Sequence, residues 1–337
     1  MRMLVTGGLG FIGSALIRKI LNETDHTILN LDSCTYAAMP EALEEKDESA
    51  KYNFLKVDLR NFQEVSDAIA NFKPHKIFHL AAESHVDRSI EDPGEFINTN
   101  IIGTFNILES IRIAGNSLPE NFTLLHISTD EVFGTLDFND KPFNETSPYQ
   151  PNSPYSASKA SSDMLVRAWH ETYDIKTVIT NCSNNYGPWQ NPEKLIPKII
   201  FNAINGNMIP IYGNGKNIRD WLHVEDHVSA LLAASETDQR FNRYVIGANQ
   251  EISNIDLTKM ICNYLDKKIP KSTTYIKQVQ YVTDRLGHDL RYAIDASHIS
   301  NTIGFNPAYK LEHGIQVTID WYLENQDWVK TKVALAT

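Results

Sequence analysis

The stretch MLVTGGLGFIGSALIRKIL, residues 3–21, decides the fold. Its first four residues predict a short buried strand, and the spacing of its later apolar residues predicts an amphipathic helix. Between them, Gly7, Gly10 and Gly13 allow a tight turn, close approach of a pyrophosphate and close packing of the helix on the sheet. The N-terminus of that helix also attracts an anion. The stretch therefore predicts a strand, a phosphate-binding turn and a helix.

A second predicted strand, residues 28–32, ends in Asp32. This acid lies about twenty residues beyond the glycines, as the dinucleotide-binding fingerprint requires. Its carboxylate would bind the ribose hydroxyls and repel a 2'-phosphate, and no arginine follows it closely. The sequence therefore favours NAD over NADP.

Further strand patterns alternate with helical patterns along the first half of the chain, which predicts a doubly wound parallel sheet of the Rossmann type in an α/β protein. The strands are expected at 54–57, 76–80 and 123–127, with helices near 61–72 and 94–114. We expect an NAD-binding Rossmann domain over 1–182, with segments near 214–240 returning to it. Residues 183–337 are expected to form a smaller, discontinuous α+β domain that binds the substrate.

Composition excludes several classes of protein. The 337 residues carry a net charge of −11, which opposes binding to nucleic acid. No apolar run approaches the roughly 20 residues of a membrane helix, and the N-terminus lacks a signal-peptide core, so we expect a cytoplasmic protein without a membrane partner. Three distant cysteines, Cys34, Cys182 and Cys262, predict neither a disulfide framework nor a zinc site.

Residues 125–134, LHISTDEVFG, carry an apolar strand directly into polar residues. Ligands bind beyond the carboxyl ends of parallel strands, so Thr129, Asp130 and Glu131 are candidates for chemistry. Side chains alternate along a strand, so both carboxylates can serve one site only if the chain has already left the pleat. A solvated turn is the alternative interpretation of such a pair.

Residues 154–160, PYSASKA, predict the start of a helix, with Asn152 and Ser153 as candidate caps. Tyr155 and Lys159 are four residues apart and share one helix face. A nearby ammonium favours the phenolate, so we expect Lys159 to lower the pKa of Tyr155 and make it a general base.

Other polar residues leave alternatives open. Asp58 could accept a hydrogen bond from adenine or cap a helix. His85 could contact a ligand or serve as a structural hydrogen bonder, and Asp87 and Arg88 are expected to pair with each other or with neighbours. His223 and His227 have the spacing of two metal ligands, but no third ligand follows, so no metal is expected.

The chain resembles the extended short-chain dehydrogenase/reductases and, within them, the 4,6-dehydratases of nucleotide sugars. The resemblance covers nearly the whole chain. It rests on TGGLGFIG at 6–13, AAESHVDRSI at 81–90, STDEVFG at 128–134, YSASK at 155–159, CSNNYGP at 182–188, PEKLIP at 192–197, RDWLHVEDH at 219–227 and DRLGHDLRYAID at 284–295. The Asp-Glu pair discriminates best, because related 4-epimerases usually lack both carboxylates.

The resemblance implies NAD-dependent removal of water from a nucleoside-diphosphate hexose, with dTDP-glucose as expected substrate and dTDP-4-keto-6-deoxyglucose as product. Tyr155, assisted by Lys159, would take the O4 proton and Thr129 would bond O4. Glu131 would remove the C5 proton while Asp130 protonates the departing C6 hydroxyl. The alternatives are a dehydratase for another sugar such as UDP-glucose, a 4-epimerase or decarboxylase, and an NAD-sensing regulator. The regulator is disfavoured because the chain keeps Tyr155 and Lys159.

The resemblance also implies binding residues and a homodimer packed through helices near 94–114 and 153–173. Expected NAD contacts are Gly7, Gly10, Phe11, Ile12, Gly13, Asp32, Ser33, Cys34, Thr35, Asp58, Leu59, Leu80, Ala81, Ala82, Ser84, Thr99, Tyr155, Lys159 and Asn185. Expected substrate contacts are Ser84, His85, Thr129, Asn184, Glu193, Lys194, Leu195, Pro210, Ile211, Tyr212, Arg219, Asp284, Arg285 and His288. The basic members of this set would neutralise the diphosphate in an otherwise acidic protein.

Overall fold

A parallel sheet of seven strands forms the centre of the protein in the computed structural model, which describes residues 1–46 and 49–336. The strand order is β10-β6-β5-β4-β1-β2-β3. The strands are β1 (Arg2–Thr6), β2 (Thr27–Asp32), β3 (Tyr52–Lys56), β4 (Lys76–His79), β5 (Thr123–Thr129), β6 (Thr177–Cys182) and β10 (Phe241–Ile246). The order reverses between β1 and β4, which opens a crevice at the carboxyl ends of the strands. The predicted doubly wound α/β fold is confirmed.

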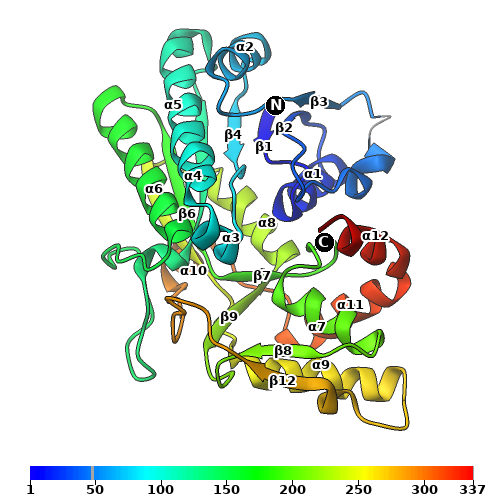
Figure 1. The fold of residues 1–337 in the computed structure, drawn as a ribbon. Coiled ribbons are helices and arrows are strands. Elements are labelled where there is room, and N and C mark those ends of the chain that lie inside the picture. The colour runs from blue at the N-terminus through cyan, green and yellow to red at the C-terminus, as the bar shows by residue number, and fades with distance from the viewer. Residues whose placement is uncertain (47–48, 337) are drawn as a thin grey trace.

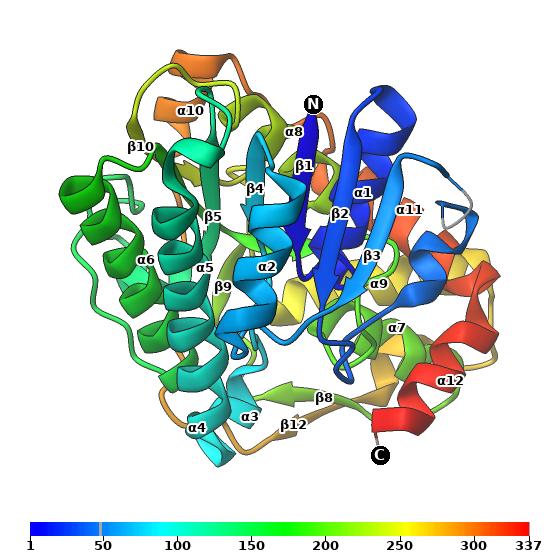
Figure 2. The same ribbon diagram turned by 90° about the horizontal axis from the view of Figure 1, so that it is seen from above.

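Helices cover both faces of this sheet (Figure 2). One face carries α2 (Phe62–Phe72), α5 (Gly103–Ala114) and α6 (Pro154–Tyr173), and the other carries α1 (Phe11–Glu23) and α8 (Val224–Ala234). Neighbouring strand residues point to opposite faces, so Leu4 packs in the core beneath α2 and α5, and Val5 in the core beneath α1 and α8. Helices on both faces explain why the inner strands are buried along nearly their whole length, whereas the edge strand β3 is mostly exposed.

A π-helical turn interrupts the long helical stretch that was predicted near 94–114. The helical stretch therefore consists of α4 (Pro93–Phe96), the π turn η2 (Ile97–Ile102) and α5. The short helix α3 (Val86–Glu91) precedes it. The extra residue turns Asn100 inward, where its Nδ2 donates to Ser158 Oγ at 2.8 Å and to Glu83 O at 3.0 Å. The turn thereby joins this helix to α6 and to the loop after β4. Short 3₁₀ turns are η1 (Pro40–Lys46), η3 (Gly115–Ser117) and η4 (Asp130–Phe133).

The second half builds a smaller α+β part around its own core (Figure 1). It holds a sheet in the order β11-β9-β7 and a parallel pair, β12 and β8. Its elements are β7 (Asn184–Tyr186), α7 (Leu195–Ile204), β8 (Ile209–Tyr212), β9 (Ile218–His223), β11 (Glu251–Ser253), α9 (Asn254–Lys268), η5 (Tyr275–Gln278), β12 (Val279–Val282), α11 (Leu311–Glu324) and α12 (Gln326–Ala336). Within the described part of the chain, no helix has the length and apolar character needed to span a membrane.

The chain returns to the large sheet in part where the sequence indicated. Within the expected range 214–240, α8 covers the large sheet, but β9 belongs to the small one. The edge strand β10 lies beyond that range, and α10 (Ser297–Ile303) packs on it. The division into two domains stays a prediction.

Candidate active site

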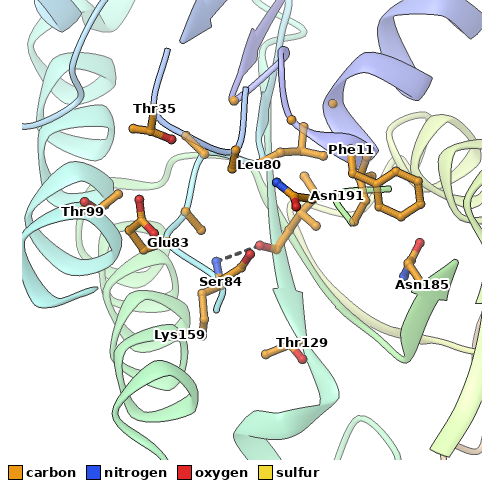
Figure 3. A pocket seen from close by; sticks show the side chains of 18 of the residues that line it. Phe11, Thr35, Leu80, Glu83, Ser84, Thr99, Thr129, Lys159, Asn185 and Asn191 are labelled. Carbon is orange, nitrogen blue, oxygen red and sulfur yellow. Dashed lines mark hydrogen bonds between the residues drawn. The ribbon is translucent and has the colours of Figure 1, made fainter. Parts of the chain in front are cut away.

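Two adjoining cavities lie at the carboxyl ends of the large sheet. The first, about 320 Å³, is lined by all five predicted catalytic residues, Thr129, Asp130, Glu131, Tyr155 and Lys159. Figure 3 shows Thr129 and Lys159 in this pocket, with Phe11 and Leu80 farther along its wall. The second cavity, about 270 Å³, shares lining residues with the first and extends toward the smaller part of the protein.

The glycine turn between β1 and α1 has no room for side chains. Gly7 has φ +69°, and a Cβ at Gly13 would lie 2.2 Å from the Gly7 carbonyl oxygen. The helix α1 begins at Phe11 after Gly10, which gives it no side-chain cap. These residues line the first cavity, so the uncapped helix end faces it. The site fits the pyrophosphate of a dinucleotide.

Asp32, at the end of β2, fits the ribose of such a dinucleotide. Its carboxylate accepts hydrogen bonds from the backbone N–H of Leu9 at 3.0 Å and of Cys34 at 2.8 Å. Burial raises its pKa, and these two hydrogen bonds oppose the change. Each oxygen keeps further acceptor capacity for ribose hydroxyls. The neighbouring lining residues, Ser33 and Thr35, offer no positive charge to a 2'-phosphate.

The other expected NAD contacts also line the first cavity, except Cys34, whose side chain is exposed. Asp58 lines this cavity, and the helix-cap interpretation of it is wrong. The cap of α2 is Asn61, whose side chain accepts from Glu64 N, while the Asp58 carboxylate pairs with Arg60 at 2.7 Å.

The acid pair reaches the cavity because the strand ends in front of it. The strand β5 stops at Thr129, and residues 130–133 form a 3₁₀ turn. Thr129 Oγ1 accepts a hydrogen bond from Glu131 N at 3.3 Å and lies 3.4 Å from Asp130 Oδ1. The other Asp130 oxygen is buried without a hydrogen-bond partner among the described residues. Asp130 and Glu131 therefore lie outside the alternating pattern of the strand, which allows both carboxylates to face one site.

Asp130 and Glu131 have different surroundings, which give their carboxyl groups different pKa values. Burial raises the pKa of Asp130 well above its usual range, and the charge of Glu131 raises it further. Burial also raises the pKa of Glu131, but Arg219 and Lys194 oppose this. Asp130 is therefore held as the neutral acid, and Glu131 ionises more readily. Such a divided pair suits acid and base roles at one pH.

Tyr155 and Lys159 lie on α6, which starts with the capping box of Ser153 and Ser156. Burial lowers the pKa of Lys159 to about 8, and its Nζ donates to Ile127 O at 2.9 Å. The prediction that Lys159 lowers the pKa of Tyr155 is wrong for the protein alone. Burial, followed by the charge of Glu131, raises the pKa of Tyr155 well above its usual range.

Four cationic side chains line the second cavity, as binding of a diphosphate requires: Lys194, Lys198, Arg219 and Arg285. Arg219 is buried, its Nη2 donates to Asp289 O at 2.9 Å, and it lies 4.2 Å from the centre of the Tyr292 ring. Lys194 donates to Ser84 O at 2.9 Å. Arg285 pairs with Asp87 at 2.8 Å.

The remaining expected substrate residues line one of the two cavities, except Ile211 and Asp284. Alternation along β8 buries Ile211 in the smaller core, while Pro210 and Tyr212 face the cavity. The Asp284 carboxylate lies 2.6 Å from Nδ1 of His288, which does line the second cavity. In Asn184, Oδ1 is buried without a hydrogen-bond partner among the described residues, which suits a ligand contact.

The loop after β4 resolves two open alternatives. His85 lines the second cavity and also caps α3, accepting from Arg88 N, and burial lowers its pKa to about 4. Asp87 and Arg88 do not pair with each other. Arg88 lies 3.6 Å from the centre of the Tyr36 ring and 3.8 Å from Glu193, and Asp87 binds Arg285.

Several lining residues escaped sequence reasoning. Asp289 and Tyr292 line the second cavity and are hydrogen-bonded to each other. Both lie in the motif at 284–295, so the signal was present in the sequence. Met39, Gln190 and Asn191 line the first cavity from irregular loops, where no periodicity marks them.

The two histidines with metal-ligand spacing have other partners. His223 caps α8, accepting from Glu225 N, and His227 Nδ1 lies 2.9 Å from Asn185 Oδ1. Residues 1–46 and 49–336 contain no group of three or more potential ligands that could hold a metal ion.

Comparisons with known proteins agree with this geometry. A family model described as GDP-mannose 4,6 dehydratase matches residues 4–318. The dTDP-glucose 4,6-dehydratase of Salmonella typhimurium is 49% identical, over 98% of this chain and 94% of that protein. The structure of the dTDP-glucose 4,6-dehydratase DesIV from Streptomyces venezuelae, with NAD bound, has a TM-score of 0.92 at 38% identity, covering 98% and 100% of the two chains. A UDP-glucose 4-epimerase from Thermotoga maritima has a TM-score of 0.86 at 25% identity, covering 97% and 100%.

Proposed function

The chain belongs to the dTDP-glucose 4,6-dehydratase family, and we propose that it converts dTDP-glucose to dTDP-4-keto-6-deoxyglucose and water with NAD as cofactor. The observation that carries this proposal is the acid pair in the cavity. A neutral Asp130 beside an ionisable Glu131 supplies the acid and the base that elimination of water needs. A 4-epimerase has no water to eliminate and needs neither group.

The residues of the first cavity fit NAD. The glycine turn accommodates the pyrophosphate, and Asp32 accepts hydrogen bonds from the ribose hydroxyls. The neutral loop after β2 contacts the remainder of the adenosine. Held there, NAD would supply the acceptor for the C4 hydride and its donor to C6.

Proton transfers fall to the chain itself. Tyr155 takes the O4 proton, oriented by Thr129. Because burial opposes its phenolate, it needs a positive charge nearby, and Lys159 is the buried cation one turn along α6. The C4 ketone acidifies the neighbouring C5–H, which Glu131 removes. Asp130 donates its proton to the C6 hydroxyl, which departs as water. Glu131 gives the proton back to C5 when the hydride adds at C6.

The second cavity holds the nucleotide. Arg219, Arg285 and Lys194 neutralise the diphosphate, and Pro210 and Tyr212 border the base. Asn184 contacts the sugar through its unpartnered oxygen.

Mass analysis of a panel of nucleotide hexoses tests the reaction and the base together. The protein is incubated with NAD and, separately, with dTDP-glucose, UDP-glucose and GDP-mannose. Loss of one water from dTDP-glucose at the highest kcat/KM supports the proposal. A higher kcat/KM with another nucleotide sugar would identify that sugar as the substrate instead. A product of unchanged mass with inverted configuration at C4 would show that the protein is an epimerase.

We also propose a homodimer that packs through α5 and α6. These adjacent helices and the π turn η2 expose large apolar side chains, which are Ile97, Ile102, Phe105, Ile113, Met164 and Tyr173. Large exposed apolar side chains gathered on neighbouring helices are typical of an interface. Sedimentation should give a dimer that Met164→Glu dissociates and that Phe138→Glu, at an exposed apolar residue elsewhere, leaves intact. A monomeric wild-type protein would contradict the assignment.

A cytoplasmic location is proposed as well, because the free thiols of Cys34, Cys182 and Cys262 suit a reducing compartment.

A further inference from the structure

A buried carboxylate lies one helical turn beyond Lys159 on α6. Tyr155, Lys159 and Asp163 follow each other at intervals of four residues, so their side chains share one face of the helix. Asp163 is 0% exposed and Lys159 is 4% exposed. The proposed reaction uses Tyr155 and Lys159 but assigns nothing to Asp163.

The groups that donate hydrogen bonds to Asp163 are uncharged, so they stabilise its carboxylate but do not cancel its negative charge. Its Oδ2 accepts hydrogen bonds from Asn181 Nδ2 at 3.0 Å and from the Tyr149 hydroxyl at 2.8 Å. Its Oδ1 lies 3.1 Å from His126 Nε2. Burial opposes ionisation, yet the pKa of Asp163 lies below its usual value because His126, Lys159 and Asn181 stabilise the carboxylate. Asp163 is therefore a buried anion.

The groups around Lys159 come from three strands and its own helix. His79 on β4 and His126 on β5 have pKa values lowered by burial and by the charge of Lys159, so both stay neutral. Cys182 on β6 has a pKa raised to about 12 and stays a thiol. Burial also keeps Tyr155 neutral in the protein alone. Asp163 is consequently the anion that most strongly opposes the effect of burial on Lys159.

An ammonium in a dry interior loses its proton unless an anion compensates it. We propose that Asp163 is a positioning residue that keeps Lys159 charged and thereby sets the upper pH limit at which Tyr155 works as the base. This inference rests on the proposed function for its effect on catalysis. The charge state of Lys159 itself can be measured independently of any reaction.

The isosteric variant Asp163→Asn removes the charge and keeps an amide oxygen that can accept from Asn181 and Tyr149. Activity requires the ammonium, so it is lost as pH rises through the pKa of Lys159, which is about 8. Without Asp163 that pKa falls, and the alkaline limb of the kcat profile should move down by about 1 to 3 pH units, the range for a close buried charge. A kcat lowered equally at all pH values, with the limb unmoved, would show a merely structural role and overturn the proposal.

Two further variants separate charge from packing. Tyr149→Phe removes one hydrogen bond to Asp163 but leaves the carboxylate, so its alkaline limb should stay close to that of the wild type. In a Lys159→Arg background the cation cannot lose its proton, and adding Asp163→Asn should produce no shift. A shift of the same size in that background would contradict the proposed route through Lys159.

Nuclear magnetic resonance gives a readout without catalysis. Lysine labelled with carbon-13 at Cε is titrated in the wild type, and Lys159→Arg identifies the Lys159 signal. The signal should titrate near pH 8 in the wild type and at lower pH in Asp163→Asn. If Asp163→Asn does not fold, Asp163→Ser provides a smaller neutral replacement for the same titration. Unchanged titration of Lys159 in a folded neutral variant would reject the inference, whatever reaction the protein catalyses.

Discussion

Asp130 and Glu131 are adjacent in sequence, but their surroundings give them different proton affinities. Asp130→Asn cannot donate a proton to the C6 hydroxyl, so turnover should fall by about 10²- to 10⁴-fold, the usual contribution of a positioned acid. Oxidation at C4 does not need this acid. In deuterated solvent the bound hexose should therefore still exchange its C5 proton. Mass spectrometry of the denatured complex should find a keto sugar that is two hydrogens lighter than the substrate and retains the C6 oxygen.

The Glu131→Gln variant provides the contrast, because its base is gone and C5 exchange should be much slower than in Asp130→Asn. Asp137→Asn, an exposed acid a few residues along the same loop, should behave as wild type. If Asp130→Asn bound substrate yet formed no keto sugar, the acid pair would belong to the oxidation step instead.

Arg219 illustrates how one residue combines structure and binding. Its guanidinium is anchored by the carbonyls of Ile218 and Asp289 and lines the second cavity. Arg219→Ala should raise the KM for the nucleotide sugar far more than it lowers kcat, by an amount corresponding to about 2–4 kcal/mol for a buried charge pair. The control is Arg167→Ala, an exposed arginine on α6. An unchanged KM in a folded Arg219→Ala protein would reject the diphosphate assignment.

At the scale of elements, α3 joins the two cavities. Asp87 at its start holds Arg285 in the second cavity, and the following Arg88 stacks on Tyr36 and approaches Glu193. Tyr36 belongs to the loop after β2, whose Thr35 and Ala37 line the first cavity, and Glu193 lines it from the loop before α7, so this contact links two walls of the cavity.

Arg88→Ala should therefore speed release of NAD. A cation–π contact contributes about 0.5–2 kcal/mol, so the dissociation rate should rise by about 2- to 30-fold. The rate is measured by trapping released NAD with an excess of a dehydrogenase that consumes it. The matched control is Arg112→Ala, which removes another arginine stacked on a tyrosine but far from the cavity. Equal rates for the two variants would remove α3 from cofactor retention.

The elements also show what sequence patterns can and cannot predict. Strand β5 and its exit at Thr129 followed from an apolar run meeting polar residues. The sequence left open whether Asp58 caps α2, because Asp and Asn are equally good caps and only geometry selects Asn61. The π turn at 97–102 left no periodic signal that distinguishes it from an α-helix.

At the scale of the whole molecule, the Rossmann sheet was predictable because local strand and helix patterns repeat. The pairing of β8 with β12 was not, because nearly seventy residues separate Ile209 from Val279 in the sequence. The Asp163 cluster depends on residues 126, 149 and 181 meeting through the fold. The error about the pKa of Tyr155 has the same origin, since burial and Glu131 outweigh the neighbour at helical spacing.

The last helix, α12, returns to the N-terminal part of the protein (Figure 1). Lys332 donates to Ala38 O at 3.0 Å and lies 3.2 Å from Glu41, in the segment whose Ala38 and Met39 line the cavity. At the other end of α12, Trp328 packs against Trp189, which precedes the lining residues 190 and 191. The C-terminal helix thus holds loops from both halves of the chain around the cofactor site.

Lys332→Met should loosen the 37–39 loop while keeping most of the side-chain volume. Loss of a largely buried charged hydrogen bond costs about 1.5–3 kcal/mol, so NAD affinity should fall by about 10- to 100-fold. NAD stabilises the folded protein in proportion to the logarithm of its concentration relative to Kd, so the rise in melting temperature on adding NAD should be smaller in this variant. Lys330→Met, which removes an exposed lysine from the same helix, should keep the full rise. If both variants kept the full rise in melting temperature, α12 would contribute only to the stability of the smaller part. The cofactor would then be held by the glycine turn and Asp32 without help from α12.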